Sequence, residues 1–482
     1  MSLFSTSAVG ETNSWAKLAL QDLAAIKTEL QENHPGAVDP QNPQFAKWMR
    51  EGYIEASQLA KTADSFGGYY FALRRYINRF NDKHLEILPS DGVKLENNFW
   101  PGFAVSLHNN QFIVSDLSDM ELNAALAKLP QPGDAVIACD GKSVNQLFAS
   151  NVQPFYGVEG LASDKNLFAP LLMFDEGNPY IQRPTRCTFN NRSSGKYYLN
   201  LNWQPITFDL FRPIWAFAFR GKADRPEIGL KQIDAGVFWI TLSSFRAKEQ
   251  EKLLSVIKTV KENSEALRSS DVIVFDVRRN VGGDSRWGED LLKSIWGEGF
   301  VERLPGGGAL AVDWRVSKSN IKAVKENRSY LANIRGEDSD EVREHDDIIA
   351  GMKRALKHGD KYYRQSIGFV SDQKAIRKGE IAPKIYLLSD GACGSSCLNF
   401  ADLVLSIPNA ELIGTETSAD TEYIENRIFE LPSNKINLFL SMKVIRGRVR
   451  GSNQPYRPTH EWNGNSWDTE DLQDWVLELS AE

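Results

Sequence analysis

Apolar residues recur at helical spacing in the first part of the chain. In residues 15–23 and again in residues 71–77, hydrophobic side chains return every three or four positions. Over residues 81–87 this pattern gives way to alternation, which indicates the start of a strand. We therefore expect residues 10–90 to form a small helical N-terminal domain, with His84 close to the junction between its last helix and a strand.

The next region, residues 91–205, is predicted to be a mainly β module, because glycine, proline and asparagine separate short alternating runs there. Residues 130–144 contain a Pro-Gly-Asp turn, a strand, an Asp-Gly turn and the start of a second strand. This order resembles one piece of a PDZ domain, a module that binds peptides along a strand edge. An ordinary β-hairpin with an Asp-Gly turn is the alternative interpretation.

Strands and helices alternate after residue 230. Almost continuously apolar strands are predicted at residues 236–242, 271–277 and 384–390, with a helix over residues 247–267 and another that starts near Leu398. Such strands indicate a sheet that is covered on both faces. Residues 315–365 are charged and helical without a strong apolar stripe, so we expect an excursion or lid there rather than part of the core.

Composition narrows the class of protein. The 482 residues are 42% hydrophobic and 25% charged, which is ordinary for a globular protein and suits roughly two to four domains. No run reaches the roughly 20 apolar residues of a membrane span, so none is expected. The formal charge of -7 offers no broad attraction for phosphate backbones, so nucleic acid is not an expected partner.

Cysteine spacing and the opening residues bear on the compartment. Cys139 and Cys187 stand alone, whereas Cys393 and Cys397 are four positions apart and form either two buried thiols or one local disulfide. A zinc site would need more Cys or His partners, so no metal is expected. Residues 1–6 lack the pattern of a secretion signal, although a signal trimmed before residue 10 would fit. A periplasmic or secreted location, which would suit a disulfide, is the expectation, and a cytoplasmic one is the alternative.

Two strand exits carry unusual residues. The first, residues 275–285, ends a buried strand in Gly282 and Gly283. Glycines let backbone N–H groups approach a ligand closely, as an oxyanion hole requires, although an ordinary turn has the same pattern. The second exit, residues 387–401, passes through small residues into a helix and leaves Ser395 and Ser396 at its start. A hydroxyl there lies in the positive field of the helix N-terminus, and helix capping is the alternative role.

Together, in this order and spacing, the two exits resemble the carboxyl-terminal processing (tail-specific) serine protease family. In that family a strand ending Asp-Leu-Arg-x-Asn-x-Gly-Gly precedes a strand that ends in a small, serine-rich turn. Residues 276–283 match the first closely, and residues 393–397 align with the second. The resemblance, which covers roughly residues 70–460, implies Ser395 as the nucleophile and the amides of Ser396 and Gly282 as the oxyanion hole.

The general base departs from one branch of that family. Members of the bacterial tail-specific type use a Ser-Lys dyad, with the lysine after a Gly-Glu-x-Thr segment. Here the corresponding segment is residues 414–420, and Asp420 stands where the lysine would be. An aspartate, with an unperturbed pKa of about 3.9, is a weak base for a serine hydroxyl. A Ser-Lys dyad is therefore not expected.

A second branch, resembling the tricorn and related chlamydial-type proteases, takes its base from an N-terminal Asp-x-His-x-x pattern. Residues 82–86 supply that pattern, which implies His84 as the general base. An imidazole, with an unperturbed pKa of about 6.5, is able to take a serine proton and pass it to the leaving amine. The remaining histidines have no such context: His34, His108, His345, His358 and His460.

The third member of a triad is less well marked. In the His-dependent branch a carboxylate after the nucleophile orients the imidazole, but the matching region, residues 450–458, contains no acid. Asn453 could do so as the Asn of papain-like proteases does, with Glu416 and Glu425 as rivals. A purely structural turn is the alternative.

The sequence thus predicts a multidomain α/β protein with a helical N-terminal domain, a PDZ-like β module and a ClpP/crotonase-like catalytic core over residues 206–482. The expected function is that of a serine endopeptidase that cleaves polypeptides through an acyl-enzyme on Ser395, with His84 as base and no cofactor. A catalytically silent peptide- or ligand-binding protein on the same scaffold is the rival, favoured by the missing lysine and acid. An α/β-hydrolase esterase is disfavoured because residues 394–397 lack the G-x-S-x-G elbow.

Overall fold

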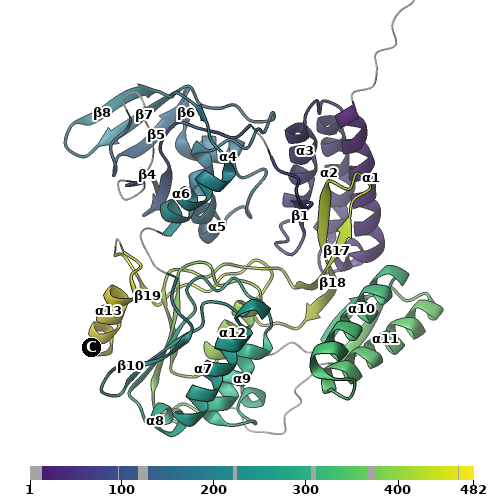
Figure 1. The fold of residues 1–482 in the computed structure, drawn as a ribbon, viewed down its shortest axis with the longest axis vertical. Helices are drawn as coiled ribbons and strands as arrows, with labels where there is room; N and C mark the ends of the chain where they lie inside the picture. Colours follow the sequence, from purple (N-terminus) through teal and green to yellow (C-terminus); the bar gives the residue numbers. More distant parts are fainter. Residues whose placement is uncertain are drawn as a thin grey trace, which may run out of the picture.

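Figure 1 shows the chain folded into several parts, with a helical N-terminal part and a β-rich part above, and a large sheet with its helices below. This computed structural model describes residues 14–95, 97–117, 129–220, 225–304, 311–366, 376–464 and 466–481. Residues 1–6, where a secretion signal would begin, lie outside these ranges. None of the helices in the described ranges is long and apolar enough to cross a bilayer.

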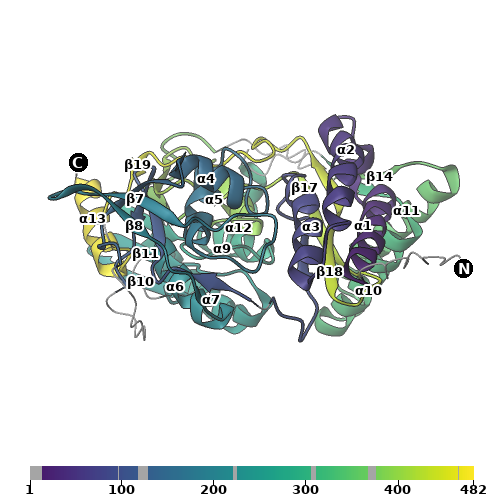
Figure 2. The ribbon, with the colours of Figure 1, turned by 90° about the horizontal axis from the view of Figure 1, so that it is seen from above.

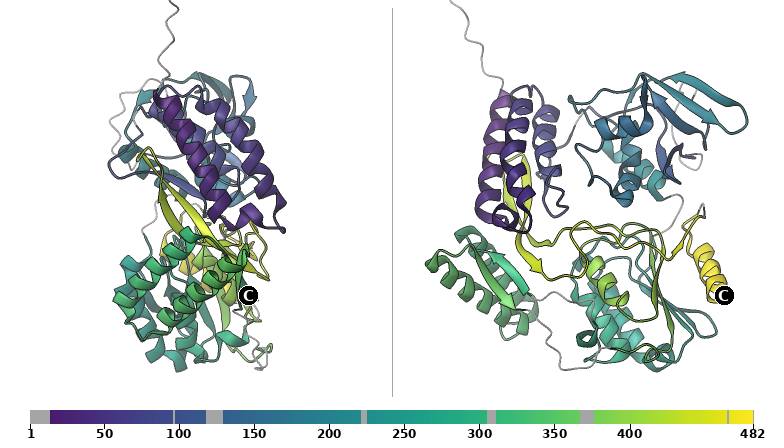
Figure 3. Two further views of the ribbon diagram at one scale, coloured as in Figure 1. Left: turned by 90° about the vertical axis from the view of Figure 1, so that its right-hand side faces the viewer. Right: turned by 180° about the vertical axis from the view of Figure 1, so that it is seen from behind.

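The N-terminal helices pack against a hairpin from near the other end of the chain. Helices α1 (Ser14–Asn33), α2 (Pro43–Ala60) and α3 (Phe66–Asn78) share one apolar core with strands β17 (Tyr423–Glu430) and β18 (Ile436–Arg446). Figure 1 and the rear view in Figure 3 show this hairpin lying along the helices. The helical region predicted from residues 10–90 is therefore completed by a sheet face that comes from the C-terminal half.

The sheet that contains this hairpin also fixes the strand after His84. Its order is β1-β18-β13-β14, and β17 also pairs with β18. Strand β1 (Glu86–Pro89) runs antiparallel to β18, with Glu86 opposite Phe439. The turn that carries His84 is therefore anchored immediately before a paired strand.

The predicted excursion at residues 315–365 is a helical hairpin flanked by strands of the same sheet. Helices α10 (Lys318–Arg335) and α11 (Asp340–His358) lie between β13 (Ala311–Arg315) and β14 (Tyr362–Ser366). Contrary to the sequence interpretation, the helices do bury an apolar stripe, which packs on Trp314. The stripe is short and interrupted by charged residues, so periodicity alone does not reveal it; it consists of Ile321, Val324, Ile348 and Met352.

The β-rich part, here called the β module, spans residues 99–220. Its strands are β2 (Phe99–Trp100), β3 (Val105–His108), β4 (Gln111–Val114), β5 (Ala135–Cys139), β6 (Lys142–Ser143), β7 (Arg186–Asn191), β8 (Gly195–Asn200) and β9 (Gln204–Pro205). The main sheet has the order β3-β4-β5-β7-β8, with β6 beside β5, and β2 pairs with β9. The module's helices are α4 (Val144–Asn151), α5 (Ala162–Phe168), η2 (Ala169–Met173) and α6 (Phe208–Arg220).

The core of the β module corrects two expectations. Phe211 and Ile214 of α6 are fully buried in it, so the core continues beyond the predicted boundary at residue 205. Cys139 and Cys187, which stand alone in the sequence, form a disulfide between the neighbouring strands β5 and β7. The two cysteines are 48 positions apart, so the sequence alone does not predict the disulfide, which depends on the pairing of β5 with β7.

The lower sheet has the order β10-β11-β12-β15-β16-β19 and is parallel from β11 onward, with β10 antiparallel at one edge. Its strands are β10 (Gly229–Asp234), β11 (Val237–Thr241), β12 (Val272–Asp276), β15 (Lys384–Ser389), β16 (Ala410–Gly414) and β19 (His460–Glu461). The associated helices are η3 (Ala247–Glu249), α7 (Gln250–Glu262), α8 (Ser264–Arg268), α9 (Arg286–Trp296), η4 (Val301–Arg303), α12 (Ser396–Val404) and α13 (Thr469–Ala481).

Apolar cores cover both faces of this sheet, as its continuous apolar strands predict. One core includes side chains of α7, α9 and α12, and the other includes Leu472 and Val476 of α13. The view from above in Figure 2 places α13 at the end of the molecule away from α1 and α10.

Strand pairing brings the two unusual exits together. Strands β12 and β15 are parallel neighbours, with Asp276 opposite Leu388. Because parallel strands end at the same edge of a sheet, the loops after Asp276 and after Ser389 leave side by side.

Candidate active site

Ser395 lies on a sharp turn between strand β15 and helix α12, which starts at Ser396. Its backbone has φ 54° and ψ -126°, in a region that costs a side-chain-bearing residue about 1–3 kcal/mol unless its surroundings enforce it. The Ser395 side chain makes no capping hydrogen bond to the helix, contrary to the capping alternative. The turn does what a nucleophile elbow does, exposing a hydroxyl between a strand and a helix, without the G-x-S-x-G sequence.

The His84 ring reaches this hydroxyl from the N-terminal part of the chain. Its Nε2 lies 3.2 Å from Ser395 Oγ, across 311 positions of sequence. This separation is within hydrogen-bonding range and suits proton transfer from a hydroxyl to an imidazole. The structure therefore brings together the two residues that the sequence patterns single out.

Asp82 fixes the turn that presents His84. Its Oδ1 accepts the His84 N–H at 3.0 Å and the Thr421 hydroxyl at 2.8 Å, while its Oδ2 lies 3.1 Å from His34 Nε2. The other nitrogen of His34 accepts the Gly36 N–H at 3.0 Å, so Nε2 carries the proton donated to Asp82. Burial raises the Asp82 pKa, but the hydrogen bond from His34 and the nearby imidazoles lower it by more than that. The net pKa is therefore below its ordinary value.

Asn280, which the sequence analysis did not assign, organises the first strand exit. Its Oδ1 accepts the Gly282 N–H at 2.9 Å, and its Nδ2 donates to the Leu242 carbonyl at 2.7 Å. Its own carbonyl accepts the Gly394 N–H at 3.3 Å, which ties the two exits together. The signal that could have found it is the fixed Asn of the first motif, whose side chain must fold back on the glycines.

Gly282 lies against the nucleophile turn. A Cβ added to it would come within 2.8 Å of Ser395 Cβ and 3.0 Å of Ser396 N, so only glycine fits this approach. Its N–H is directed to Asn280, however, so the predicted oxyanion role of this amide requires sharing that proton. Ser396 begins α12, and the N–H of a first helical residue has no acceptor within its helix.

Asn453 lies beside the His84 turn, but among the described residues its side chain makes no hydrogen bond to the His84 ring. Its Nδ2 donates to the Asn81 carbonyl at 2.8 Å, and its backbone has φ 56°. Within the described part of the chain, Asn453 Oδ1 and His84 Nδ1 are both buried and have no hydrogen-bonding partner. The two rivals for an orienting role are engaged elsewhere, since Glu416 accepts the Ser163 N–H at 3.0 Å and Glu425 pairs with Lys443 at 3.1 Å.

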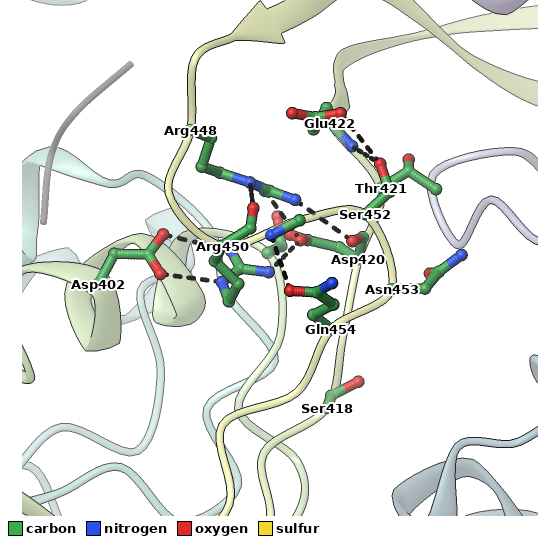
Figure 4. Close-up of polar contacts among 12 residues, drawn as sticks. Asp402, Ser418, Asp420, Thr421, Glu422, Arg448, Arg450, Ser452, Asn453 and Gln454 are labelled. Atoms are coloured by element: carbon green, nitrogen blue, oxygen red, sulfur yellow. Dashed lines mark hydrogen bonds and ion pairs between the residues drawn. The ribbon is translucent and has the colours of Figure 1, made fainter. Parts of the chain in front are cut away.

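An ion-pair network holds the loop that carries Asn453 (Figure 4). Asp420 Oδ1 accepts from Arg448 at 3.0 Å and from Arg450 at 2.8 Å, and Arg450 also contacts Asp402 at 2.8 Å. These side chains are almost fully buried. The Asp420 carbonyl in turn accepts the Asn453 N–H at 2.7 Å. Asp420 therefore anchors this loop through its contacts with two arginines.

Lys83 is a cation next to the candidate base, and the sequence analysis did not single it out. Its Nζ is ion-paired with Asp164 of helix α5 and donates to Ser418 Oγ at 2.8 Å. It therefore ties the His84 turn to the β module and to the loop before Asp420.

A pocket of about 430 Å³ opens in front of Ser395 and His84, between the N-terminal part, the β module and the lower sheet. Its lining includes the apolar side chains of Ile77, Leu85, Ile87, Phe155, Leu167 and Phe168. Arg74 and Glu86 add charge, and burial raises the Glu86 pKa while Arg74 opposes that rise. No cluster of metal-ligating side chains occurs among the residues that the structure describes.

Comparison with known proteins gives a fold-level result. No family model and no curated protein match the chain. Among solved structures, mature CPAF matches with a TM-score of 0.62 at 13% identity, over 96% of both chains. The fold resembles that of mature CPAF. CPAF complexed with lactacystin gives a TM-score of 0.63 at 14% identity, over 96% of this chain and 98% of that one. The photosystem II D1 C-terminal processing protease gives a TM-score of 0.36 at 11% identity, over 93% of both.

Replacing Asp82 with Asn is expected to lower the free energy of unfolding by about 1–3 kcal/mol at pH 7, because a buried donor loses its acceptor. Folding lowers the Asp82 pKa from its ordinary 3.8, so this stabilisation is full above that value and is lost as the pH falls through the folded-state pKa. Urea unfolding at pH 7 and at pH 3 measures the difference between wild type and Asp82→Asn, which should shrink at the lower pH. Asp340→Asn, at a 95% exposed side chain, is the control, and an equal gap at both pH values would contradict the assignment.

Gly282→Ala is expected to displace the nucleophile turn and slow labelling of Ser395 by a fluorophosphonate by on the order of 100-fold. Gly297→Ala is a matched control, because Gly282 and Gly297 have φ 100° and 99°, but a Cβ at Gly297 meets nothing within 4 Å. Both variants place a Cβ at nearly the same φ, and only the Cβ at position 282 would meet the turn of Ser395. Equal labelling rates in the two variants would show that the approach of Gly282 to Ser395 does not matter.

Proposed function

We propose that this protein is a serine endopeptidase of the carboxyl-terminal processing type, with Ser395 as nucleophile and His84 as general base. The observation that carries the proposal is the 3.2 Å separation of Ser395 Oγ and His84 Nε2 on a strained strand-to-helix turn. Similarity of fold to mature CPAF over nearly the whole chain supports it.

The proposed reaction is acyl transfer to water. His84 Nε2 takes the Ser395 proton as Oγ attacks a peptide carbonyl carbon, and the carbonyl oxygen becomes an oxyanion. The Ser396 N–H, at the positive end of α12, stabilises that charge, with the Gly282 N–H sharing its proton between Asn280 and the oxyanion. The imidazolium then protonates the leaving amine, and a water activated by the neutral imidazole releases the acyl group.

The proposal of a His-dependent branch rests on the charged residues around the site and on how they are paired. Asp420 occupies the position of the lysine of the Ser-Lys branch and is held by Arg448 and Arg450. Lys83, the nearby lysine, is held by Asp164. These contacts support His84 as the base for Ser395.

A polypeptide is the proposed substrate. The apolar pocket beside Ser395 is suited to a nonpolar side chain, and its borders come from the β module as well as from the lower sheet. We further propose that the β module is PDZ-like and holds an extended segment by strand addition, and that the lower sheet is a ClpP/crotonase-like core. Disulfides in the β module and beside Ser395 favour an oxidising compartment, and therefore a periplasmic or secreted location.

The decisive test is labelling with a fluorophosphonate probe. Wild type and Ser396→Ala should be labelled, whereas Ser395→Ala should not, and His84→Ala should react more slowly by roughly 100-fold or more. Lactacystin, with which mature CPAF has been solved in complex, is a second compound to test against wild type and Ser395→Ala.

The rival function gives a different result. A peptide- or ligand-binding protein on this scaffold would leave Ser395 unlabelled in freshly purified wild type while still binding peptides. Labelling that survives Ser395→Ala would place the reactive group elsewhere and would overturn the assignment.

We propose that Asn453 orients the His84 ring through its side-chain oxygen. In Asn453→Asp, a new carboxylate near the imidazole would favour the protonated ring, so the acid limb of the pH–labelling profile should move to higher pH. Asn453→Ala should slow labelling by roughly tenfold without that shift. Asn434→Asp, at an exposed asparagine with the same φ of 56°, is the control, and an unshifted profile in Asn453→Asp would remove Asn453 from the mechanism.

A further inference from the structure

The candidate nucleophile is enclosed by a disulfide. Cys393 and Cys397 are bonded to each other, and the ring they close contains Gly394, Ser395 and Ser396. It therefore holds both the proposed nucleophile and the proposed amide donor. Cys397 lies in the first turn of α12, and Cys393 lies in the loop after β15, so the bond joins the helix start to the strand exit.

This disulfide contributes less to the stability of the fold than the other one. The loss of chain entropy in the unfolded state grows with the number of residues that a disulfide encloses. Cys393 and Cys397 are four positions apart, whereas Cys139 and Cys187 are 48 apart. The main consequence of the shorter link is therefore local, at the turn that it closes.

The shortest backbone hydrogen bond of the turn lies on the C-terminal side of Ser395. On its C-terminal side, the Ser395 carbonyl accepts N–H groups from Leu398 at 2.8 Å and Asn399 at 3.3 Å. On its N-terminal side, the Gly394 N–H reaches Asn280 at the longer distance of 3.3 Å. Across the turn, the Cys397 N–H donates to the Gly394 carbonyl at 3.1 Å. A residue with a φ of 54° persists only where its surroundings enforce that conformation, and the disulfide is the covalent link that closes the turn around Ser395.

We propose that the Cys393–Cys397 disulfide is a positioning group for Ser395, so that the protein is fully reactive only in its oxidised form. The inference rests on the proposed function. Reduction by a dithiol transfers two electrons and two protons to the pair, leaves two cysteine thiols and converts the dithiol to its disulfide. The turn is then free to relax, and Ser395 Oγ leaves its alignment with His84 Nε2.

The first test compares two double variants with the fluorophosphonate probe. Cys393→Ala/Cys397→Ala should lower the maximal labelling rate by on the order of 10- to 100-fold, with little change in the probe concentration that half-saturates it. Cys139→Ala/Cys187→Ala, which removes the disulfide of the β module, should keep the wild-type maximal rate. Thermal unfolding of each variant shows that the protein is folded.

The second test keeps all the sulfur atoms beside Ser395, because alanine at two buried positions also leaves a cavity. In the Cys139→Ala/Cys187→Ala background, reduction with dithiothreitol should slow labelling and reoxidation should restore it, with the state of the pair read by mass spectrometry. If that background fails to fold, wild type is used, and mass spectrometry assigns which disulfide has opened.

The outcomes separate this inference from the proposed function. Labelling of oxidised wild type, together with equal labelling of its reduced form, overturns the positioning role and leaves the peptidase assignment standing. Absence of labelling in oxidised wild type overturns both. A reversible loss on reduction that tracks the Cys393–Cys397 pair supports both.

Discussion

One buried carboxylate, that of Asp82, joins distant parts of the chain at the candidate active site. It is surrounded by the His34 ring, the His84 N–H and the Thr421 hydroxyl. An ionised carboxylate is costly to bury unless such donors surround it, so the turn has one favourable arrangement. That arrangement presents the His84 ring to Ser395 through contacts that do not involve Ser395. His84 is thus placed by the fold of the N-terminal part against strand β18 and the loop before β17, and not by contact with Ser395.

Most of the first motif supports the candidate site without touching Ser395. Asp276 and Arg278 form a buried pair at 2.7 Å, and Arg278 also donates to Thr469 Oγ1 at 2.9 Å, which joins the strand exit to the start of α13. Asn280 then holds Gly282 against the nucleophile turn. The polar residues of the motif therefore fix the backbone of the first strand exit. Because that backbone is fixed, the second exit, which carries Ser395, is able to pack closely against it.

Local patterns in the sequence predicted the parts of the structure that lie on continuous segments. The strand exits at Gly282 and Ser395 and the helix-to-strand junction at His84 are of this kind. What remained hidden depends on contact between distant segments: the Cys139–Cys187 disulfide requires a strand pairing, and the ion pair of Lys83 requires the β module to meet the His84 turn. An alternating run such as β18 predicts a strand but not its neighbours, because a half-buried pattern fits any sheet with a free edge.

Asp420 shows how a change of base involves the surrounding charges as well. In this chain a single carboxylate oxygen accepts from both Arg448 and Arg450, and Arg450 is held on its other side by Asp402. A lysine at position 420 would place a third cation against two buried guanidinium groups, where little solvent screens the repulsion. The arginines that anchor the loop of Asn453 are therefore compatible with an anion at position 420 and not with a lysine. The network that disfavours a lysine at position 420 also holds the loop beside His84, so the two features have a common electrostatic origin.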